Sequence, residues 1–511
     1  MRRVIVDKVL PWVVFALFVI AAIVPWILTA VYAPRYTFFR VPIASWFVLG
    51  LSGLLLALDV AALCLWRWFR AARRELVDLK KPPLEVEIPI VYGHKNLDRA
   101  EFLAIIQALF GRSSGAGYLH TTPLPGGYGG STTVLVDLRR GQEDGSTSRS
   151  YVVKLGDRRE MADEHEKFHR HVLGQLKHAA RFYRYTEWES LAGIAYEFVG
   201  LGRGHQVQSF YQFYQGHTAV EVAEMIGEVY AHLNRAWYWM GRKETEDLYG
   251  EYRLLSKKQR HIISHVGEIV DEDDPYRFNF AGVQGRLRPN LKPTFCPELD
   301  MPWHDPVAFL RTWPRPNLNV PVYRSIVHGD LHAQNVLVEA GPHGQREAWF
   351  IDFSHTGNGL SGDRTREALG GGVPIDPDRG HTLRDFCRLE ADVKFILTRL
   401  ESEDDLRLAL AFERELMAGG LSLCDLPATP PPTEALTQER FRQAWLVIRE
   451  IRRRAADYLI GPDDLRPYYL SLLHATLPLV YYHQDQFENE TCERQQKRYA
   501  LLAAGMLCSQ L

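Results

Sequence analysis

One nine-residue segment, 327–335, constrains this chain more than any other. It reads Val-His-Gly-Asp-Leu-His-Ala-Gln-Asn, and short strand-like runs at 325–327 and 335–338 bracket its polar centre. A third strand-like run, 348–352, follows and ends on Asp352. This strand–loop–strand context on both sides makes a chance grouping of histidine and aspartate residues the weaker interpretation.

Three polar residues in this region suit the transfer of a phosphoryl group, which requires a proton acceptor and ligands for Mg²⁺. Asp330 and Asn335 have the separation of the base and the metal-binding asparagine in H-R-D-x-x-x-x-N. Asp352 stands where a metal-bridging aspartate belongs. A zinc site built from His328 and His332 is the alternative, but it leaves the order of the other three residues unexplained.

The other parts of a kinase-type site occur earlier in the chain, in the order that such a site requires. A glycine-rich turn would let the backbone approach the phosphates of a nucleotide; its glycines include Gly127, Gly129 and Gly130. Lys154 is a charged residue in an apolar strand-like run, so it is the candidate phosphate-binding lysine. Glu164, on the apolar face of the next predicted helix, is its expected partner, with Glu166 as the alternative.

The segment 327–335 resembles the Brenner-type catalytic motif of aminoglycoside phosphotransferase, choline kinase and related kinase-like enzymes, where H-G-D replaces H-R-D. The resemblance covers about residues 117–400. It implies a two-lobed protein-kinase-like fold that binds ATP and Mg²⁺ between its lobes. It also implies that the backbone of a hinge containing Glu197 and Val199 contacts the purine.

The resemblance further implies two structural residues and leaves the acceptor open. His328 would stabilise the loop, and Asp385, in a helix similar to the one that supports this loop in the family, would anchor it. The chain departs from the common pattern at Ser354, where many kinases have the glycine of D-F-G. A long segment also separates the hinge from the loop, and because the family builds its acceptor site there, the acceptor cannot be transferred by analogy.

Two long apolar stretches, 9–33 and 41–66, open the chain, and each exceeds the roughly 20 residues that cross a bilayer. Basic residues precede the first stretch and follow the second, which places both ends in the cytoplasm. We therefore expect a transmembrane hairpin at 1–66, a linker at 67–83, and a multi-pass cell-membrane protein with a cytoplasmic catalytic domain. The helices could also support an oligomer, and Asp59 would pair within the membrane or reach the headgroups.

The remaining chain is expected to be α+β: a kinase-like N-lobe at 84–200 and a C-lobe at 201–511. The C-lobe would contain a helical insert at about 201–320 and a helical extension at about 401–511. Within the extension, three segments have aromatic and leucine faces suited to packing: 434–459, 464–483 and 489–510. The formal net charge of −2 gives no general attraction to nucleic acid.

These features favour a membrane-anchored phosphotransferase that moves the γ-phosphate of ATP to a hydroxyl of a small molecule or lipid headgroup. A glycine, rather than arginine, before Asp330 favours small acceptors over proteins. A pseudokinase or nucleotide-gated scaffold is the alternative from another class. Lys154, Asp330, Asn335 and Asp352 are all present, which speaks against that alternative. Kinase or nucleotidyl transfer to a protein is the third possibility.

Overall fold

The chain divides into two compact units, Met1–Leu84 with Gly111–Ser114, and Glu85–Phe110 with Gly115–Leu511. The computed structural model describes residues 37–38, 41–42, 85–87, 99–110, 118–123, 132–139, 149–197, 206–252, 262, 277–280, 283–286, 294–296, 301–306, 309–310, 319–341, 344–360, 376, 378–418, 422–482 and 484–511. In the first unit, β1 (Thr37–Phe38) and β2 (Val41–Pro42) form a short antiparallel pair. All other described elements belong to the second unit.

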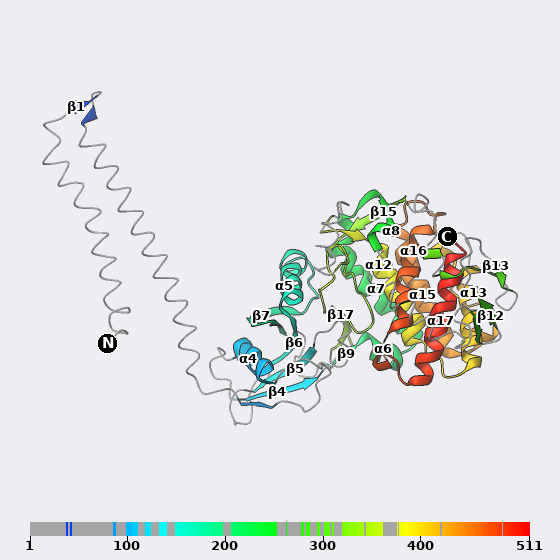
Figure 1. The fold of residues 1–511 in the computed structure, drawn as a ribbon, viewed down its shortest axis with the longest axis horizontal. Coiled ribbons are helices and arrows are strands. Elements are labelled where there is room, and N and C mark those ends of the chain that lie inside the picture. Colours follow the sequence, from blue (N-terminus) through cyan, green and yellow to red (C-terminus); the bar gives the residue numbers. More distant parts are fainter. Residues whose placement is uncertain are drawn as a thin grey trace. The chain divides into compact units, whose positions relative to one another are not determined.

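A six-stranded sheet forms the amino-terminal part of the second unit (Figure 1). Its order is β3-β4-β5-β6-β8-β7, and only β3 and β4 pair in parallel. The strands are β3 (Glu85–Glu87), β4 (Tyr118–Pro123), β5 (Thr132–Arg139), β6 (Arg149–Asp157), β7 (Arg181–Trp188) and β8 (Leu191–Glu197). The helical segments beside them are α4 (Arg99–Phe110), α5 (Arg158–Lys167) and the π-helix η2 (Phe168–Val172).

Different helices cover the two faces of this sheet. α4 packs on β7 and β8, and α5 packs on β6 and β8. On the α4 face, Gly193 leaves room for the helix, because a Cβ there would lie 2.5 Å from the side chain of Ile105 and 3.3 Å from that of Leu155. Successive side chains of a strand point to opposite faces. Lys154, the neighbour of Leu155 in β6, therefore points to the α5 face.

Two three-stranded antiparallel sheets lie in the rest of the unit, in the orders β17-β16-β9 and β10-β15-β18. Their strands are β9 (Gln206–Ser209), β10 (Arg242–Asp247), β15 (Asn319–Ser325), β16 (Val336–Ala340), β17 (Arg346–Phe350) and β18 (Gly380–His381). Two short hairpins pair β11 (Arg277–Phe280) with β12 (Val283–Arg286), and β13 (Thr294–Cys296) with β14 (Met301–Trp303). The loop 326–335 runs from β15 of one sheet to β16 of the other.

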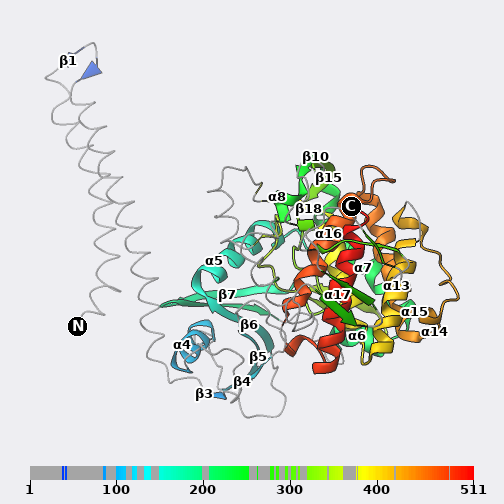
Figure 2. The same ribbon diagram turned by 45° about the vertical axis from the view of Figure 1, so that its right-hand side comes forward.

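Helices surround a single hydrophobic core in this part of the unit. They are α6 (Phe210–Gly216), α7 (Ala219–Ala236), α8 (Leu248–Tyr252), α12 (Leu383–Asp392), α13 (Glu403–Ala418), α14 (Glu434–Thr437), α15 (Glu439–Ala455), α16 (Arg466–Thr476) and α17 (Glu490–Cys508). Short 3-10 or π turns are η3 (Tyr238–Met240), η5 (Val393–Leu397), η6 (Leu423–Asp425), η7 (Ala456–Tyr458), η8 (Leu477–Tyr481) and η9 (Gln484–Gln486). α7 packs against α15, and α16 against α17 (Figure 2). α12 also packs against α16.

The predicted fold class requires a correction at the amino terminus. No helix among the described residues is long and apolar enough to cross a membrane. At the start of the second predicted span, Val41–Pro42 forms a strand and not a helix. The prediction was made from hydropathy, which measures how apolar a run of residues is and not its conformation. Apart from Thr37–Phe38, the rest of 1–66, Asp59 included, lies outside the described residues. The transmembrane hairpin and the multi-pass localisation derived from it are therefore not retained.

Candidate active site

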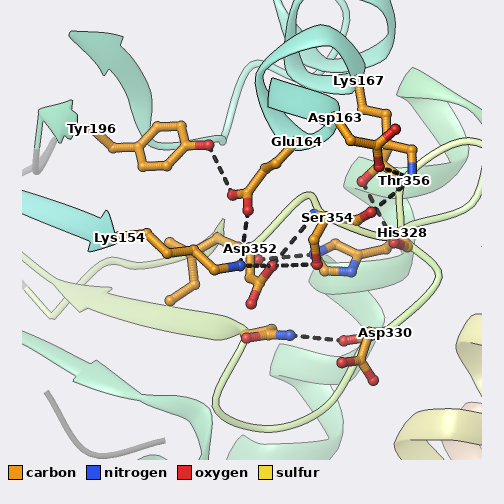
Figure 3. Close-up of polar contacts among 12 residues, drawn as sticks. Lys154, Asp163, Glu164, Lys167, Tyr196, His328, Asp330, Asp352, Ser354 and Thr356 are labelled. Carbon is orange, nitrogen blue, oxygen red and sulfur yellow. Dashed lines mark hydrogen bonds and ion pairs between the residues drawn. The ribbon is translucent and has the colours of Figure 1, made fainter. Parts of the chain in front are cut away.

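Lys154 lies between two carboxylates (Figure 3). Its Nζ donates to Oε2 of Glu164 at 2.8 Å and to Oδ1 of Asp352 at 2.7 Å. The Glu164 side chain is fully buried, and its other oxygen accepts from the hydroxyl of Tyr196 at 3.0 Å. The sequence left Glu164 and Glu166 as alternatives. The structure pairs Lys154 with Glu164, whereas Glu166 is exposed.

The start of α5 explains how Glu164 reaches this position. Asp157, the last residue of β6, caps the helix, because its carboxylate accepts from the backbone N–H of Arg159 at 2.8 Å. The helix therefore begins directly after the strand that carries Lys154, and it packs back on that strand. Met161 and Glu164 are one turn apart on its buried face, so the same packing that buries the methionine brings the carboxylate to the lysine.

The loop between β15 and β16 brings Asp330 and Asn335 together. The side-chain amide of Asn335 donates to the backbone oxygen of Asp330 at 2.9 Å, and its backbone N–H donates to the His332 carbonyl at 2.9 Å. The backbone N–H of Ile351 donates to the Asn335 carbonyl at 3.1 Å, which connects this loop to the residue before Asp352. One third of the Asp330 side chain is exposed, so it remains accessible to a substrate.

α12 holds the beginning of this loop. The carboxylate of Asp385 accepts from the backbone N–H groups of His328 at 2.7 Å and Gly329 at 2.8 Å, and from the hydroxyl of Tyr238 at 2.7 Å. His328 is fully buried, with Nε2 at 3.0 Å from the carbonyl oxygen of Ile351. This is the geometry that the structural roles predicted for His328 and Asp385 require.

The same helix contacts the loop at two further points that the sequence analysis missed. Arg388 Nε donates to Oδ1 of Asp330 at 2.9 Å, and Oδ2 of Asp392 accepts from the backbone N–H of Ala333 at 2.7 Å. Asp385, Arg388 and Asp392 follow one another at intervals of three and four residues, which places them on one face of a helix. A helical-wheel comparison with Asp385 could have identified both residues.

The segment after Asp352 is attached to the site from two sides. Asp352 has a left-handed backbone, with φ of +62°, and its Oδ1 accepts from the hydroxyl of Ser354 at 2.8 Å. Lys167 of α5 donates to the carbonyl oxygen of Ser354 at 2.7 Å and pairs with Asp163 at 2.9 Å (Figure 3). It also donates to the carbonyl oxygen of Leu360 at 2.5 Å. The sequence analysis missed Lys167 as well, although it follows Glu164 by three residues on the same helix face.

The charges of the site stabilise one another. Burial disfavours the charged form of Lys154, but the carboxylates of Asp352 and Glu164 outweigh burial and raise the pKa of the ammonium above its usual value. Burial likewise opposes ionisation of both aspartates. The Lys154 ammonium nevertheless lowers the pKa of Asp352, and the Arg388 guanidinium lowers the pKa of Asp330, both to well below the usual range. All three groups are therefore charged at neutral pH.

The oxygens of Asn335 and Asp352 fit a magnesium ion. Mg²⁺ commonly takes one or two carboxylates and completes its shell with waters and substrate phosphates. The amide nitrogen of Asn335 is used by the loop, which leaves its oxygen directed elsewhere. The described hydrogen bonds of the Asp352 carboxylate fall on Oδ1. Across the described ranges, no group of three or more histidine, cysteine, aspartate or glutamate residues could hold a metal ion by itself.

Most of the predicted nucleotide-binding residues cannot be located. Gly127, Gly129, Gly130 and Val199 lie outside the described residues. Glu197 is the half-buried last residue of β8, and its nucleotide-binding role stays a prediction.

Comparison with known proteins does not establish a family. No protein-family model matches the sequence, and no curated protein matches it significantly. A solved structure of ethanolamine kinase from Plasmodium vivax aligns with 82% of this chain and 97% of its own length, at 12% sequence identity and a TM-score of 0.29. A TM-score this low carries no weight for fold or function, so the function is inferred below from the site residues themselves.

Proposed function

We propose that this chain is an ATP-dependent phosphotransferase that moves the γ-phosphoryl group of ATP to a hydroxyl of a small molecule. The observation that carries the proposal is the series of contacts from Glu164 through Lys154 to Asp352, next to the loop of Asp330 and Asn335. A kinase-type site needs both its lysine–glutamate pair and its metal-binding aspartate in place. In this chain Lys154 takes part in both, because it pairs with Glu164 and also with Asp352, the proposed metal ligand.

Each of these side chains has a defined task in the proposed reaction. Lys154, held by Glu164, would contact the phosphates of ATP. Asp330 would orient the acceptor hydroxyl and take its proton as the new O–P bond forms and the bond from phosphorus to the ADP oxygen breaks. When bound, Mg²⁺ would neutralise charge on the phosphates, with Asn335 and Asp352 as its protein ligands.

The residue before Asp330 supports a small acceptor. Many protein kinases are switched on by a phosphate on the activation loop that pairs with arginine, and H-R-D places an arginine at this position. Here the position is Gly329, with φ of +85°, and a Cβ on it would lie 2.7 Å from the Cα of Gly359. An arginine therefore cannot occupy this position without moving the backbone of the loop.

The test is an assay of the purified full chain with Mg²⁺ and ATP labelled on the γ-phosphate, with water and a panel of small alcohols as acceptors. We expect label on inorganic phosphate or on an alcohol. Asp330→Asn should reduce the rate by about 10²- to 10⁴-fold, the usual contribution of a general base, and Asp352→Asn should also abolish most turnover. Asp463→Asn, at an exposed aspartate outside the site, is the matched control and should leave the rate unchanged.

Equal rates in the wild type and both active-site variants would contradict the proposal and favour a pseudokinase. ATP labelled on the α-phosphate separates the remaining alternatives. Label from this ATP on protein would indicate nucleotidyl transfer, whereas γ-label on protein would indicate a protein kinase.

A further inference from the structure

Arg388 contacts the group proposed to accept the substrate proton. Its Nε donates to Oδ1 of Asp330 at 2.9 Å, and the arginine is 8% exposed. Its Nη1 lies 3.7 Å from Oδ1 of Asp392, one helical turn further along α12, and its guanidinium carbon lies 6.0 Å from the centre of the Tyr482 ring. The orientation of the guanidinium is thus set by a carboxylate on its own helix and by an aromatic ring.

These contacts are part of a larger attachment of α12 to the loop. Asp385 binds the backbone at the start of the loop, and Asp392 binds the backbone N–H of Ala333 near its end. Arg388 lies between them and binds the side chain of Asp330. The two aspartates hold the loop's backbone, and Arg388 adds control over the direction of the reactive carboxylate.

Several other charged or titratable groups face Asp330. His332 Nε2 is 3.8 Å from its Oδ2, and His355 also favours the ionised carboxylate. Asp352, from the segment after β17, also faces Asp330, whose negative charge acts to raise the pKa of the Asp352 carboxyl. The remaining two, Asp392 of α12 and Tyr482 after η8, face Arg388. Arg388 makes the closest described ion pair with Asp330, because its nitrogen approaches to hydrogen-bond distance and that of His332 does not.

We propose that Arg388 is a positioning residue that occupies Oδ1 of Asp330 and leaves Oδ2 to meet the acceptor hydroxyl. The inference rests on the proposed phosphotransferase function. A carboxylate with one oxygen held by a guanidinium cannot rotate freely, so its second oxygen keeps one direction. Such control matters because misplacing a reacting group by about 1 Å can cost about 100-fold in rate.

The test compares two substitutions of Arg388 in the full chain, with Mg²⁺-ATP and water as the acceptor. Arg388→Gln removes the charge, and we expect kcat/KM at pH 7.5 to fall between about tenfold and about 100-fold. Because a misdirected carboxylate slows the reaction without weakening nucleotide binding, the loss should fall on kcat and leave KM for ATP unchanged. Arg388→Lys keeps a donor at this position and should recover part of the lost kcat.

Arg407→Gln is the matched control, because this arginine makes an exposed bidentate pair with Glu434 and touches no residue of the site. It should behave as the wild type. A wild-type kcat in Arg388→Gln would overturn the role of Arg388. A loss confined to KM for ATP, or no recovery in Arg388→Lys, would show that Arg388 does not position Asp330, and would also overturn it.

A second measurement does not depend on turnover. A crystal structure of Arg388→Gln can be compared with one of the wild type, both with Mg²⁺-ADP. We expect the side chain of Asp330 to change its rotamer in the variant, while the backbone of 327–335 stays in place. If the wild type turns over no ATP, the proposed function fails, and an unchanged Asp330 rotamer in Arg388→Gln would separately refute the inference about Arg388.

Discussion

At the scale of single residues, two unusual backbone conformations shape the site. Gly329 has φ of +85° and Asp352 has φ of +62°, in the left-handed region that L-residues other than glycine, asparagine and aspartate rarely adopt. The first conformation lets both Asp385 oxygens accept backbone N–H groups, and the second presents the carboxylate of Asp352 to Lys154. Strained conformations of this kind concentrate at functional sites and are maintained by the surrounding contacts.

Substitution of Gly329 tests how much of the site depends on this conformation. In Gly329→Ala the new Cβ would be strained by the positive φ and would lie 2.7 Å from the Cα of Gly359. We expect the free energy of unfolding to fall by about 2–5 kcal/mol, from left-handed strain of about 1–2 kcal/mol and overpacking of about 1–3 kcal/mol. Urea unfolding measures this change, and ATP turnover should fall with it.

Gly344 provides a matched control for this prediction. It also has a positive φ, of +79°, but a Cβ there would meet nothing within 4 Å. Gly344→Ala should therefore lose only the strain contribution of about 1–2 kcal/mol and keep its activity. If both substitutions were equally mild, close packing at Gly329 would not be important for the loop.

At the scale of elements, two lysines connect α5 and its neighbour β6 to the segment 352–360. Lys154 joins Glu164 of α5 to Asp352, and Lys167 joins the same helix to the carbonyls of Ser354 and Leu360. The Lys167 ammonium has three hydrogens and three partners, since Asp163 also accepts from it at 2.9 Å. The helix that carries Glu164 is therefore held against the segment that follows the proposed metal ligand.

Removing this second connection should loosen the site without unfolding the protein. Lys167→Met keeps the length of the side chain but leaves the carbonyls of Ser354 and Leu360 without their donor. We expect the unfolding free energy to fall by about 1–3 kcal/mol and KM for ATP to rise. Backbone amides of 354–360 should exchange faster with deuterium, which peptide-level hydrogen exchange measures directly.

Lys177→Met is the control for this experiment, because Lys177 is exposed and lies just after the π-helix that continues α5. It should change neither the KM for ATP nor the exchange of 354–360. If Lys167→Met showed the same exchange as Lys177→Met, Lys167 would not restrain the segment.

At the scale of the whole molecule, buried ion pairs join the helices that support the site. Arg452 of α15 donates from Nε and Nη2 to the two oxygens of Glu390 of α12, at 3.0 and 2.7 Å. The hydroxyl of Tyr468, from α16, donates to the same carboxylate. Arg452 is 3% exposed and Glu390 is fully buried, so neither charge can be compensated by water. α12, which holds the loop of Asp330, is thereby connected to two other helices.

Breaking this pair should affect global stability more than any surface pair does. Arg452→Met leaves the buried Glu390 carboxylate without its ion-pair partner, and we expect the free energy of unfolding to fall by about 3–5 kcal/mol. The double variant Glu390→Leu with Arg452→Met should recover most of this loss, because replacing a whole buried pair with apolar side chains is often neutral. Chemical denaturation of the variants measures both changes.

The exposed pair of Arg407 and Glu434 again provides the comparison. Arg407→Met should leave the free energy of unfolding nearly unchanged, because water and salt screen the charges of an exposed pair. A similar small loss for Arg452→Met would mean that Glu390 becomes protonated or hydrated at little cost when its partner is removed.

Several features were predictable from local sequence patterns alone. The sequence named Lys154, Asp330, Asn335 and Asp352 as site residues and left Glu164 and Glu166 as alternatives. The structure places Glu164, Lys154 and Asp352 in contact and Asn335 beside Asp330, while their roles in a reaction stay predictions. The three carboxy-terminal segments predicted to be helical contain α15, α16 and α17. These predictions rest on periodicity and on short-range spacing, which the backbone geometry of helices and strands converts directly into positions.

Other features were decided only by packing between distant parts of the chain. Arg388 reaches Asp330 across 58 positions, and Lys167 reaches Leu360 across 193. Helix spacing can place Arg388 and Lys167 on the right helix faces, but it cannot name their partners, because these pairs exist only once α12 and α5 have packed against the same loops. The membrane hairpin is an error of another kind, because the sequence analysis predicted a feature that is not retained. An apolar composition was interpreted there as a transmembrane conformation. A local sequence pattern is therefore enough to name a site residue that lies within one helix, strand or turn. Tertiary packing decides which charged side chains form pairs, because it brings together segments that are far apart in the sequence.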